Sequence, residues 1–193
     1  MIHTVITEVH LPAGVAGPDP MDFDVRCFLI PHATGLTLVD TGLEHTVPSI
    51  AAQLSSIGAA WSDVTDVILT HDHPDHIGGL SSVTALAPSA AVWGGAVAAE
   101  DGTMIRGLRV VATPGHTPGH LSLLATDDDV LLIGDLAGTQ DGRLMRAPAA
   151  FTADPAEAER SLRKASGLDF AVLYPSHGAP STPQALQDLL DRR

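Results

Sequence analysis

Thr70-His71-Asp72-His73-Pro74-Asp75-His76-Ile77-Gly78-Gly79 is the stretch of this chain that carries the densest group of ligand-type side chains. Within it, three imidazoles and two carboxylates fall in six consecutive residues. Alternate residues of an extended segment point to the same side, so His71 and His73 can bind one ion together. Asp75 and His76 are then available to a second ion. Because imidazole nitrogen and carboxylate oxygen are ligands for zinc, iron or manganese, the stretch predicts a metal site.

The histidine content of the chain offers a simpler explanation, because ten histidines in 193 residues will sometimes cluster by chance. At this composition, the pattern His-x-His-x-Asp-His is expected at about 10⁻⁵ per starting position, or roughly 2 in 1000 chains. Chance therefore does not account for the motif.

Length and composition narrow the class of protein. The chain has 193 residues, of which 45% are hydrophobic and 17% charged, and we expect residues 1–193 to form one compact domain. The formal net charge of −13 would repel nucleic-acid phosphates, which disfavours a nucleic-acid partner. Without a signal-like start or an apolar run of about 18 residues, a cytoplasmic protein with no membrane partner is expected. Cys27, the one cysteine, is expected to be a buried structural thiol.

Alternation of apolar and polar residues predicts strands interspersed with a few helices, and two strand-rich halves closed by helices indicate two packed sheets with helices outside. The strands are expected at Ile2–His10, Asp22–Ile30, Gly35–Val39, Asp66–Leu69, Ala90–Trp93, Gly107–Ala112, Leu121–Ala125, Val130–Ile133 and Phe170–Leu173. The helices are expected at Thr46–Ile57, Pro155–Ala165 and Pro183–Asp191. Pro12–Pro20 and Ala137–Asp154 are expected to be loops, the second of them beside the site.

Four further segments place a histidine or an aspartate directly after an apolar strand. They are Leu38–Gly42, Thr113–His120, Leu132–Asp135 and Tyr174–Gly178. Glycine beside most of these positions permits tight turns and a close approach of the backbone. We therefore expect these strand ends to converge on one edge of the sheets.

The order of these motifs resembles that of the metallo-β-lactamase fold superfamily, in particular its glyoxalase II-like hydrolase branch, over nearly the whole chain. The resemblance implies an α+β fold, a four-layer αβ/βα sandwich, with a two-metal site between the sheets. The implied ligands are His71, His73 and His116 for the first metal, and Asp75, His76 and His177 for the second, with Asp135 as the bridge. Asp40 is implied to support the site without binding a metal directly.

Each outlying residue also has a purely structural explanation. His116 could end a Pro/Gly turn, Asp135 could be a turn residue, and His177 could be a solvated loop histidine. The spacing of His120 from His116 also suits a ligand, but the resemblance assigns that role to His116, so we expect His120 to support the site. Asp40 could cap the helix that follows it. We expect it instead to orient a ligand histidine by accepting its second ring N–H.

Two divalent ions, zinc in preference to iron or manganese, would lower the pKa of a shared water from about 15.7 towards 7. The water would attack the carbonyl of a thioester, a lactone or another ester, and Asp75 is the expected catalytic residue that orients it. The expected partner is a small-molecule substrate. A loop containing Arg143, Met145 and Arg146 could bind an anionic group of that substrate, but exposed arginines are usually just solvated. No substrate-binding residue or oligomeric state is predicted.

Several relatives of this resemblance are disfavoured by departures in the chain. One large class of β-lactamases uses a late cysteine ligand, whereas Cys27 precedes every metal motif. Acyl-homoserine lactonases carry a tyrosine shortly after the bridging aspartate, where this chain has Leu136 and small residues. A persulfide dioxygenase stays an alternative, holding one iron with His71, His116 and Asp135. The second alternative is a non-catalytic metal- or metabolite-binding protein, although structural zinc sites are usually closed and rich in cysteine.

Overall fold

The computed structural model describes residues 1–14, 18–95 and 99–192, and these residues form two five-stranded sheets. The first sheet has the order β1 (His3–Leu11), β2 (Met21–His32), β3 (Gly35–Val39), β4 (Val64–Ile68) and β5 (Ala91–Trp93). The second has the order β12 (Val172–Pro175), β9 (Val130–Gly134), β8 (Leu121–Ala125), β7 (Leu108–Ala112) and β6 (Met104–Ile105). A separate hairpin joins β10 (Ala137–Gln140) to β11 (Arg143–Arg146). The α-helices are α1 (Val47–Ser56), α2 (Pro74–Ile77), α3 (Leu80–Leu86), α4 (Pro155–Ser166) and α5 (Pro183–Asp191), and 3-10 helices cover Glu44–Thr46, Trp61–Asp63 and Ala149–Phe151.

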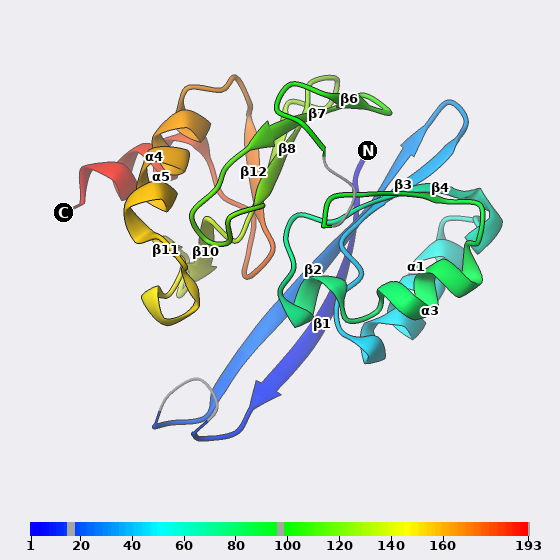
Figure 1. The fold of residues 1–193 in the computed structure, drawn as a ribbon, viewed down its shortest axis with the longest axis horizontal. Helices are drawn as coiled ribbons and strands as arrows, with labels where there is room; N and C mark the ends of the chain where they lie inside the picture. The colour runs from blue at the N-terminus through cyan, green and yellow to red at the C-terminus, as the bar shows by residue number, and fades with distance from the viewer. Residues whose placement is uncertain (15–17, 96–98, 193) are drawn as a thin grey trace.

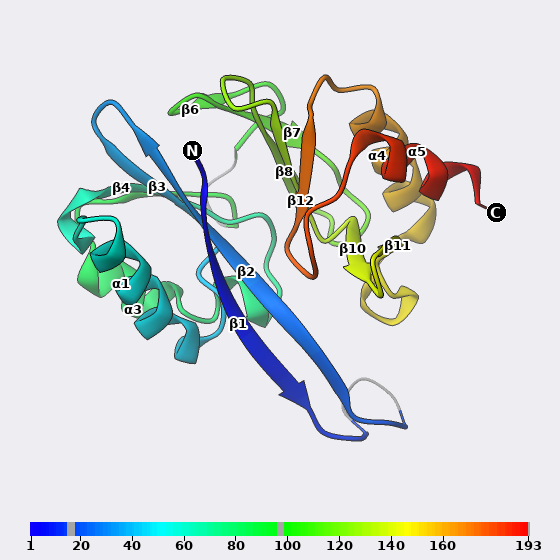
Figure 2. The ribbon, with the colours of Figure 1, turned by 180° about the vertical axis from the view of Figure 1, so that it is seen from behind.

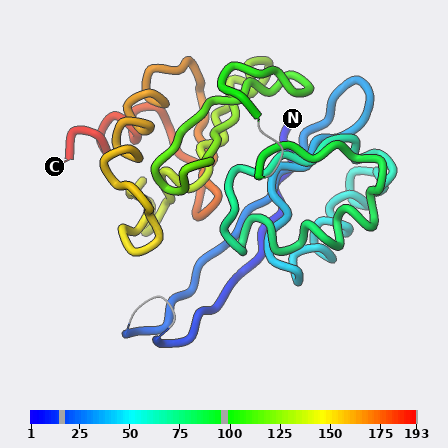
Figure 3. The backbone as a smooth tube through the Cα atoms, in the orientation of Figure 1, coloured from blue at the N-terminus to red at the C-terminus, as the bar shows by residue number. Residues whose placement is uncertain are grey.

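Helices lie on the outer side of each sheet, so the molecule has four layers. Figure 1 shows α1 and α3 beside the first sheet and α4 and α5 beside the second. The view from behind shows the same arrangement (Figure 2). In Figure 3, the red C-terminal end of the chain lies on the far side of the molecule from α1 and α3. The α+β fold and the four-layer αβ/βα sandwich implied by the resemblance are therefore confirmed.

Three apolar clusters separate these layers, and strand alternation decides which residue enters which cluster. Along β2, Cys27 and Leu29 pack with Ile50 of α1 in the outer cluster of the first sheet. Phe28 and Ile30 point the other way, into the cluster between the two sheets. A third cluster lies between the second sheet and helices α4 and α5. Cys27 is fully buried, as predicted.

Strand direction explains why the metal motifs lie together. β3 runs parallel to β4, and β12 runs parallel to β9. β8 is antiparallel to both β7 and β9, so β7, β9 and β12 share one direction. Each sheet therefore gathers the carboxyl ends of its motif-bearing strands at one edge. A backbone hydrogen bond from Leu121 N to the carbonyl of Thr70 (2.8 Å) joins the two sheets there.

Most predicted elements are present within about two residues of their expected bounds, and three helices carry the local signals that start them. Pro48 lies in the first turn of α1, where a missing N–H costs no hydrogen bond. The Asp154 side chain caps α4 by accepting a hydrogen bond from Glu157 N, and Thr182 caps α5 in the same way.

The segment Ala137–Asp154 departs most from expectation, because it is not a loop. It forms β10 and β11, with Asp141 and Gly142 between them at positive φ, followed by a 3-10 helix. An Asp-Gly pair takes these φ values at low cost, which is why it closes the hairpin. Helices α2 and α3 and strand β6 were not predicted. The expected loop Pro12–Pro20 includes residues 15–17, which lie outside the described residues. Among the described helices, none has the length and apolar character needed to cross a membrane.

Candidate metal centre

Seven donor side chains from both sheets meet at the edge where the strands end. His71 and His73 follow β4, and the short helix α2 carries Asp75 and His76. His116 lies in the connection between β7 and β8, Asp135 directly follows β9, and His177 closely follows β12. Their donor atoms form two groups: His71, His73, His116 and Asp135 in one, and Asp75, His76 and His177 in the other, with all atoms of a group within 4.8 Å of one another.

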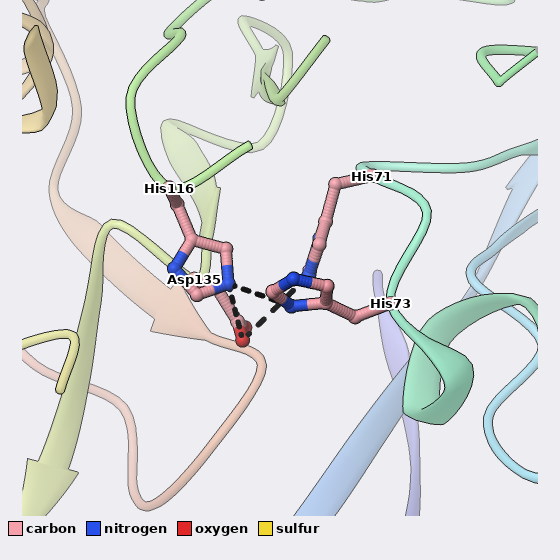
Figure 4. Close-up of side chains that lie close together, drawn as sticks. All are labelled: His71, His73, His116 and Asp135. Carbon is pink, nitrogen blue, oxygen red and sulfur yellow. Dashed lines mark hydrogen bonds and ion pairs between the residues drawn. The ribbon is translucent and has the colours of Figure 1, made fainter. Parts of the chain in front are cut away.

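The first group faces a common point from two sides. Figure 4 shows His71 and His73 reaching in from one segment, with His116 and Asp135 opposite. His73 Nδ1 lies 3.0 Å from His116 Nε2, and Asp135 Oδ2 lies 3.5 Å from the same nitrogen. His71 Nε2 is 3.8 Å from Asp135 Oδ2. Four donors thus surround one small space.

The second group lies directly beside Asp135 of the first group. His177 Nε2 lies 3.4 Å from Asp75 Oδ2, and His76 Nε2 lies 3.8 Å from that same oxygen. The Asp135 carboxylate presents Oδ1 to His76 at 3.5 Å and Oδ2 to His177 at 3.1 Å. One carboxylate therefore lies between the two groups and can serve both.

The donor atoms fit divalent cations in spacing and in unmet bonding. Tetrahedral ligands at about 2.0–2.1 Å from zinc are separated from one another by about 3.4 Å, and the distances above scatter around that value. His71 Nε2, His76 Nε2 and Asp135 Oδ1 are buried without a hydrogen-bond partner. Buried polar atoms without partners are costly, and all three lie at this centre. The residues present therefore fit a metal-binding role.

Four of the five histidines are held so that Nε2 faces the centre. In each, Nδ1 lies beside an oxygen outside the donor groups: Thr70 Oγ1 for His71 (3.1 Å), Asp40 Oδ2 for His76 (2.8 Å), Thr152 Oγ1 for His116 (3.4 Å) and the Asp24 carbonyl for His177 (2.7 Å). A proton on Nδ1 leaves the Nε2 lone pair free to bind a cation. His73 is the exception, because it presents Nδ1 to the centre.

Asp40 is hydrogen-bonded to one of the donor histidines. Its carboxylate is fully buried and accepts hydrogen bonds from Thr70 N (2.7 Å), Thr70 Oγ1 (2.8 Å) and His76 Nδ1 (2.8 Å). Its φ of +59° lies in the left-handed region, which aspartate tolerates better than most residues. Asp40 therefore orients the imidazole of His76.

His120 is buried beside the centre, with both ring nitrogens occupied. Nε2 accepts a hydrogen bond from Asp135 N (3.0 Å), and Nδ1 donates to the carbonyl of Thr113 (3.1 Å). Gly134, at a φ of +64°, passes so close that a Cβ there would lie 2.5 Å from His120 Nε2. His120 is thus hydrogen-bonded to the strand end that carries Asp135.

Burial and neighbouring charges shift the pKa values of the histidines and of Asp135 at the centre in different directions. Burial lowers the pKa of His71, of His116 to about 4 and of His120 to about 3. Burial alone would also lower the pKa of His177, but the Asp135 carboxylate outweighs it and raises that pKa to about 9. The pKa of His76 is raised likewise by Asp135 and Asp40. Burial opposes the charge of Asp135, yet His177 and His76 hold its pKa well below the ordinary value. Protons on these histidines therefore balance the buried carboxylate, and a bound cation would displace them.

Outside the donor groups, one residue of a possible anion-binding segment is engaged elsewhere, and two residues that contact the donors were not predicted. Arg146 belongs to the segment that could bind an anionic group, but its Nε pairs with Glu159 (2.9 Å) and its Nη1 donates to the carbonyl of Leu189 (2.9 Å). It is thereby committed to α4 and α5. The supporting residues Thr70 and Asp24 were not predicted. Thr70 stands directly before the first histidine of the donor groups, whereas Asp24 has no sequence signal.

Comparison with known proteins places the chain in a family. A family model described as the metallo-beta-lactamase superfamily matches residues 21–98 and 97–177. The chain belongs to the metallo-beta-lactamase superfamily. One relative in the superfamily is metallo-beta-lactamase domain-containing protein 1 of Xenopus laevis, 36% identical over 158 residues, with 74% of this chain and 66% of that protein covered. Thioesterase pkgB of Emericella nidulans is 30% identical over 141 residues, with 67% and 39% covered.

A solved structure with the same fold is a metallo-beta-lactamase family protein from Thermus thermophilus. It superposes with a TM-score of 0.67 at 21% identity and covers 97% of this chain and 78% of that one. The chain spans 31% to 66% of the length of curated relatives such as probable metallo-hydrolase YflN of Bacillus subtilis and the Xenopus protein.

Proposed function

We propose that this protein is a metal-dependent hydrolase whose site binds two divalent cations, with zinc as the expected metal. The observation that carries the proposal is the set of buried, unpartnered donor atoms at one centre: His71 Nε2, His76 Nε2 and Asp135 Oδ1. A histidine- and carboxylate-rich site of this kind suits zinc, iron and manganese alike. The proposed ligands are His71, His73 and His116 for one cation, Asp75, His76 and His177 for the other, and Asp135 for both.

The second donor group supports two cations rather than one. A single iron held by His71, His116 and Asp135 would leave His76 Nε2 buried without a partner. A second cation would give a bonding partner to that nitrogen, to Asp75 and to His177. The dinuclear hydrolase is therefore the better account of this arrangement than the mononuclear dioxygenase.

The site combines a buried interior with a partly open side. The side chains of His71 and His76 are fully buried, whereas 22% of Asp75 and 25% of His177 is exposed. Structural metal sites are usually closed and built from cysteine, and Cys27 packs in the outer core instead. A substrate can thus approach from the Asp75 side, which supports a catalytic over a structural role.

Divalent cations bound there would supply a Lewis acid for the substrate carbonyl and would make water acidic enough to react near neutral pH. The Asp75 carboxylate lies on the partly exposed side of the second group, where it can accept a hydrogen bond from the attacking water and orient it towards the carbonyl. Two hydrogen bonds keep the imidazoles fixed as the charge of the reacting groups changes. Asp40 holds His76 through Nδ1, and the Asp24 carbonyl holds His177 through Nδ1. We propose a thioester, a lactone or another ester as the substrate. The thioesterase among the relatives favours the first.

The test is a metal analysis followed by a substrate panel. Protein purified without added metal is expected to contain about two zinc ions per chain, and zinc-loaded protein to hydrolyse at least one thioester, lactone or ester faster than the Asp75→Ala variant does. One iron and no zinc per chain, with oxygen consumption on a persulfide, would refute the hydrolase proposal in favour of the dioxygenase. A metal-loaded protein that hydrolyses none of the panel, and whose cation only raises the melting temperature, would favour a structural role.

The remaining expectations concern partners and location. A small molecule is the proposed substrate, because a net charge of −13 opposes nucleic-acid binding. The cytoplasmic location stays a prediction.

A further inference from the structure

The last ligand of the centre is held by a strand of the other sheet. His177 follows β12 in the second sheet, yet its Nδ1 donates a hydrogen bond to the main-chain carbonyl of Asp24 in β2 (2.7 Å). The next residue, Gly178, donates its N–H to Asp24 Oδ1 (2.6 Å). The other carboxylate oxygen, Oδ2, accepts a hydrogen bond from Arg26 Nε (2.6 Å). Asp24 thus contacts both the imidazole and the backbone of this segment.

The opposite side of the same segment is fixed by β10. Thr139 N donates to the carbonyl of His177 (2.9 Å). Gly178 has a φ of +84°, and a Cβ at that position would lie 1.9 Å from the Thr139 carbonyl oxygen, so no side chain fits there. The peptide between His177 and Gly178 is therefore clamped between β2 and β10.

The Asp24 side of this clamp is largely shielded from water. Only 14% of the Asp24 side chain and 12% of the Arg26 side chain is exposed. A hydrogen bond to an ionised acceptor in such a place is shorter and stronger than a neutral one. The carboxylate therefore contributes more to the placement of Gly178 than an exposed ion pair would.

We propose that Asp24 is a positioning residue that fixes His177 for the second cation, an inference that rests on the dinuclear site proposed above. Its carboxylate fixes the backbone of Gly178, and its carbonyl fixes the ring of His177. The first donor group is supported from elsewhere, by Thr70 and Thr152. Loss of the Asp24 carboxylate should therefore weaken the second cation and leave the first in place.

The experiment compares three variants of the full chain by titration of the metal-free protein with zinc, using a competing chelator to resolve two dissociation constants. Asp24→Ala removes the acceptor of the Gly178 N–H. Asp24→Asn keeps an oxygen of the same size at that position but loses the charge. Asp22→Ala is the matched control, because this aspartate lies in the same strand with an 81% exposed side chain and an exposed partner, His10.

For Asp24→Ala, we expect the second zinc to bind about 10- to 100-fold more weakly, as is typical when an outer-shell hydrogen bond that supports a ligand is lost; here it is the bond from Gly178 N to the Asp24 carboxylate. The first zinc should bind as in the wild type. Asp24→Asn should lose less affinity, and Asp22→Ala none.

Equal weakening of both zinc sites, or no weakening of either, would overturn the role of Asp24. If Asp24→Ala does not fold, Asp24→Asn decides, and it must weaken the second zinc more than the first. A wild-type chain that binds only one zinc would instead refute the dinuclear proposal itself. Two zinc ions in the wild type and unchanged constants in Asp24→Ala would refute only the role of Asp24.

Discussion

Replacing Asp40 with asparagine tests whether its carboxylate positions His76 in the candidate metal centre. The three donors at Asp40, namely Thr70 N, Thr70 Oγ1 and His76 Nδ1, lie 2.7–2.8 Å from a carboxylate that is fully buried. Asparagine offers one oxygen and an NH₂ group. The hydroxyl of Thr70 can rotate to accept a hydrogen bond from that NH₂, but His76 Nδ1–H cannot. The proton of His76 is then favoured on Nε2, the atom that faces the centre.

The size of the effect follows from this lost contact. A hydrogen bond to a charged group contributes about 1.5–3 kcal/mol to stability. For a domain of this length, Asp40→Asn should therefore lower the melting temperature of the metal-free protein by about 3–12 °C, at about 2–4 °C per kcal/mol. Because a proton on Nε2 competes with the cation, the affinity for the second zinc should fall about 10- to 100-fold.

Thermal unfolding and a chelator-competition titration measure these two quantities. Asp141→Asn is the matched control, because Asp141 also has a positive φ (50°) but is exposed in the β10–β11 turn. Asparagine tolerates this backbone conformation at both positions, so strain does not separate the two variants. A melting temperature and a zinc affinity for Asp40→Asn that equal those of Asp141→Asn would refute the reasoning.

Three further predictions address other features. In the metal-free protein, burial lowers the pKa of His116 to about 4, and Asp135 raises the pKa of His177 to about 9. The free energy of unfolding should therefore fall below pH 6.5 because of His116 and above pH 6.5 because of His177, with a maximum near pH 6.5. A flat profile of melting temperature between pH 4 and 10 would contradict this. Gly134→Ala should destabilise the protein by several kcal/mol, on the order of an overpacked core site, because its Cβ collides with His120, whereas Gly142→Ala, at φ 72° with nothing within 4 Å, should cost only about 1–3 kcal/mol of backbone strain. Arg106→Ala should lower the free energy of unfolding by about 1–2 kcal/mol, because it leaves the buried Asp66 carboxylate without its charged partner, and should leave the zinc affinity unchanged. Denaturant unfolding measures the stability and a zinc titration measures the affinity. A weakened zinc site would show that the ion pair is not independent of the centre.

The fold was predictable where one residue pattern dominates. The apolar alternation in β1 and β2 and the short buried strands β8 and β9 have little competition from helix, so their bounds are within about two residues of expectation. Helices α2 and α3 were missed because Pro74 and the pair Gly78-Gly79 interrupt the helical pattern. Tertiary contacts override this: a Cβ at Gly79 would lie 2.5 Å from the carbonyl of Thr41, so glycine serves close packing there.

The site was predictable in its donors and less so in its supports. His71 to His76 form a motif in the sequence, and Asp40, His116, Asp135 and His177 each follow a strand. The structure brings all the expected donors together, while their binding of metal stays a prediction. Asp24 was missed because its contact with His177 joins residues 153 positions apart, and no local pattern encodes a contact of that range. The β10–β11 hairpin, in contrast, carries its Asp-Gly turn signal in the sequence and could have been predicted from it.

The origin of the donors in opposite sheets has a consequence for assembly. Each donor group draws side chains from the segments before β5 and from those after β6, so a cation would bind the docked pair of halves and would have no complete site on either half alone. Because a ligand that binds only one state shifts the equilibrium by mass action, a zinc concentration about 100 times its dissociation constant would favour docking by about 2.7 kcal/mol. Two fragments cut between β5 and β6 would then reassociate in proportion to free zinc. The centre would in that case link the two halves of the chain in a zinc-dependent way.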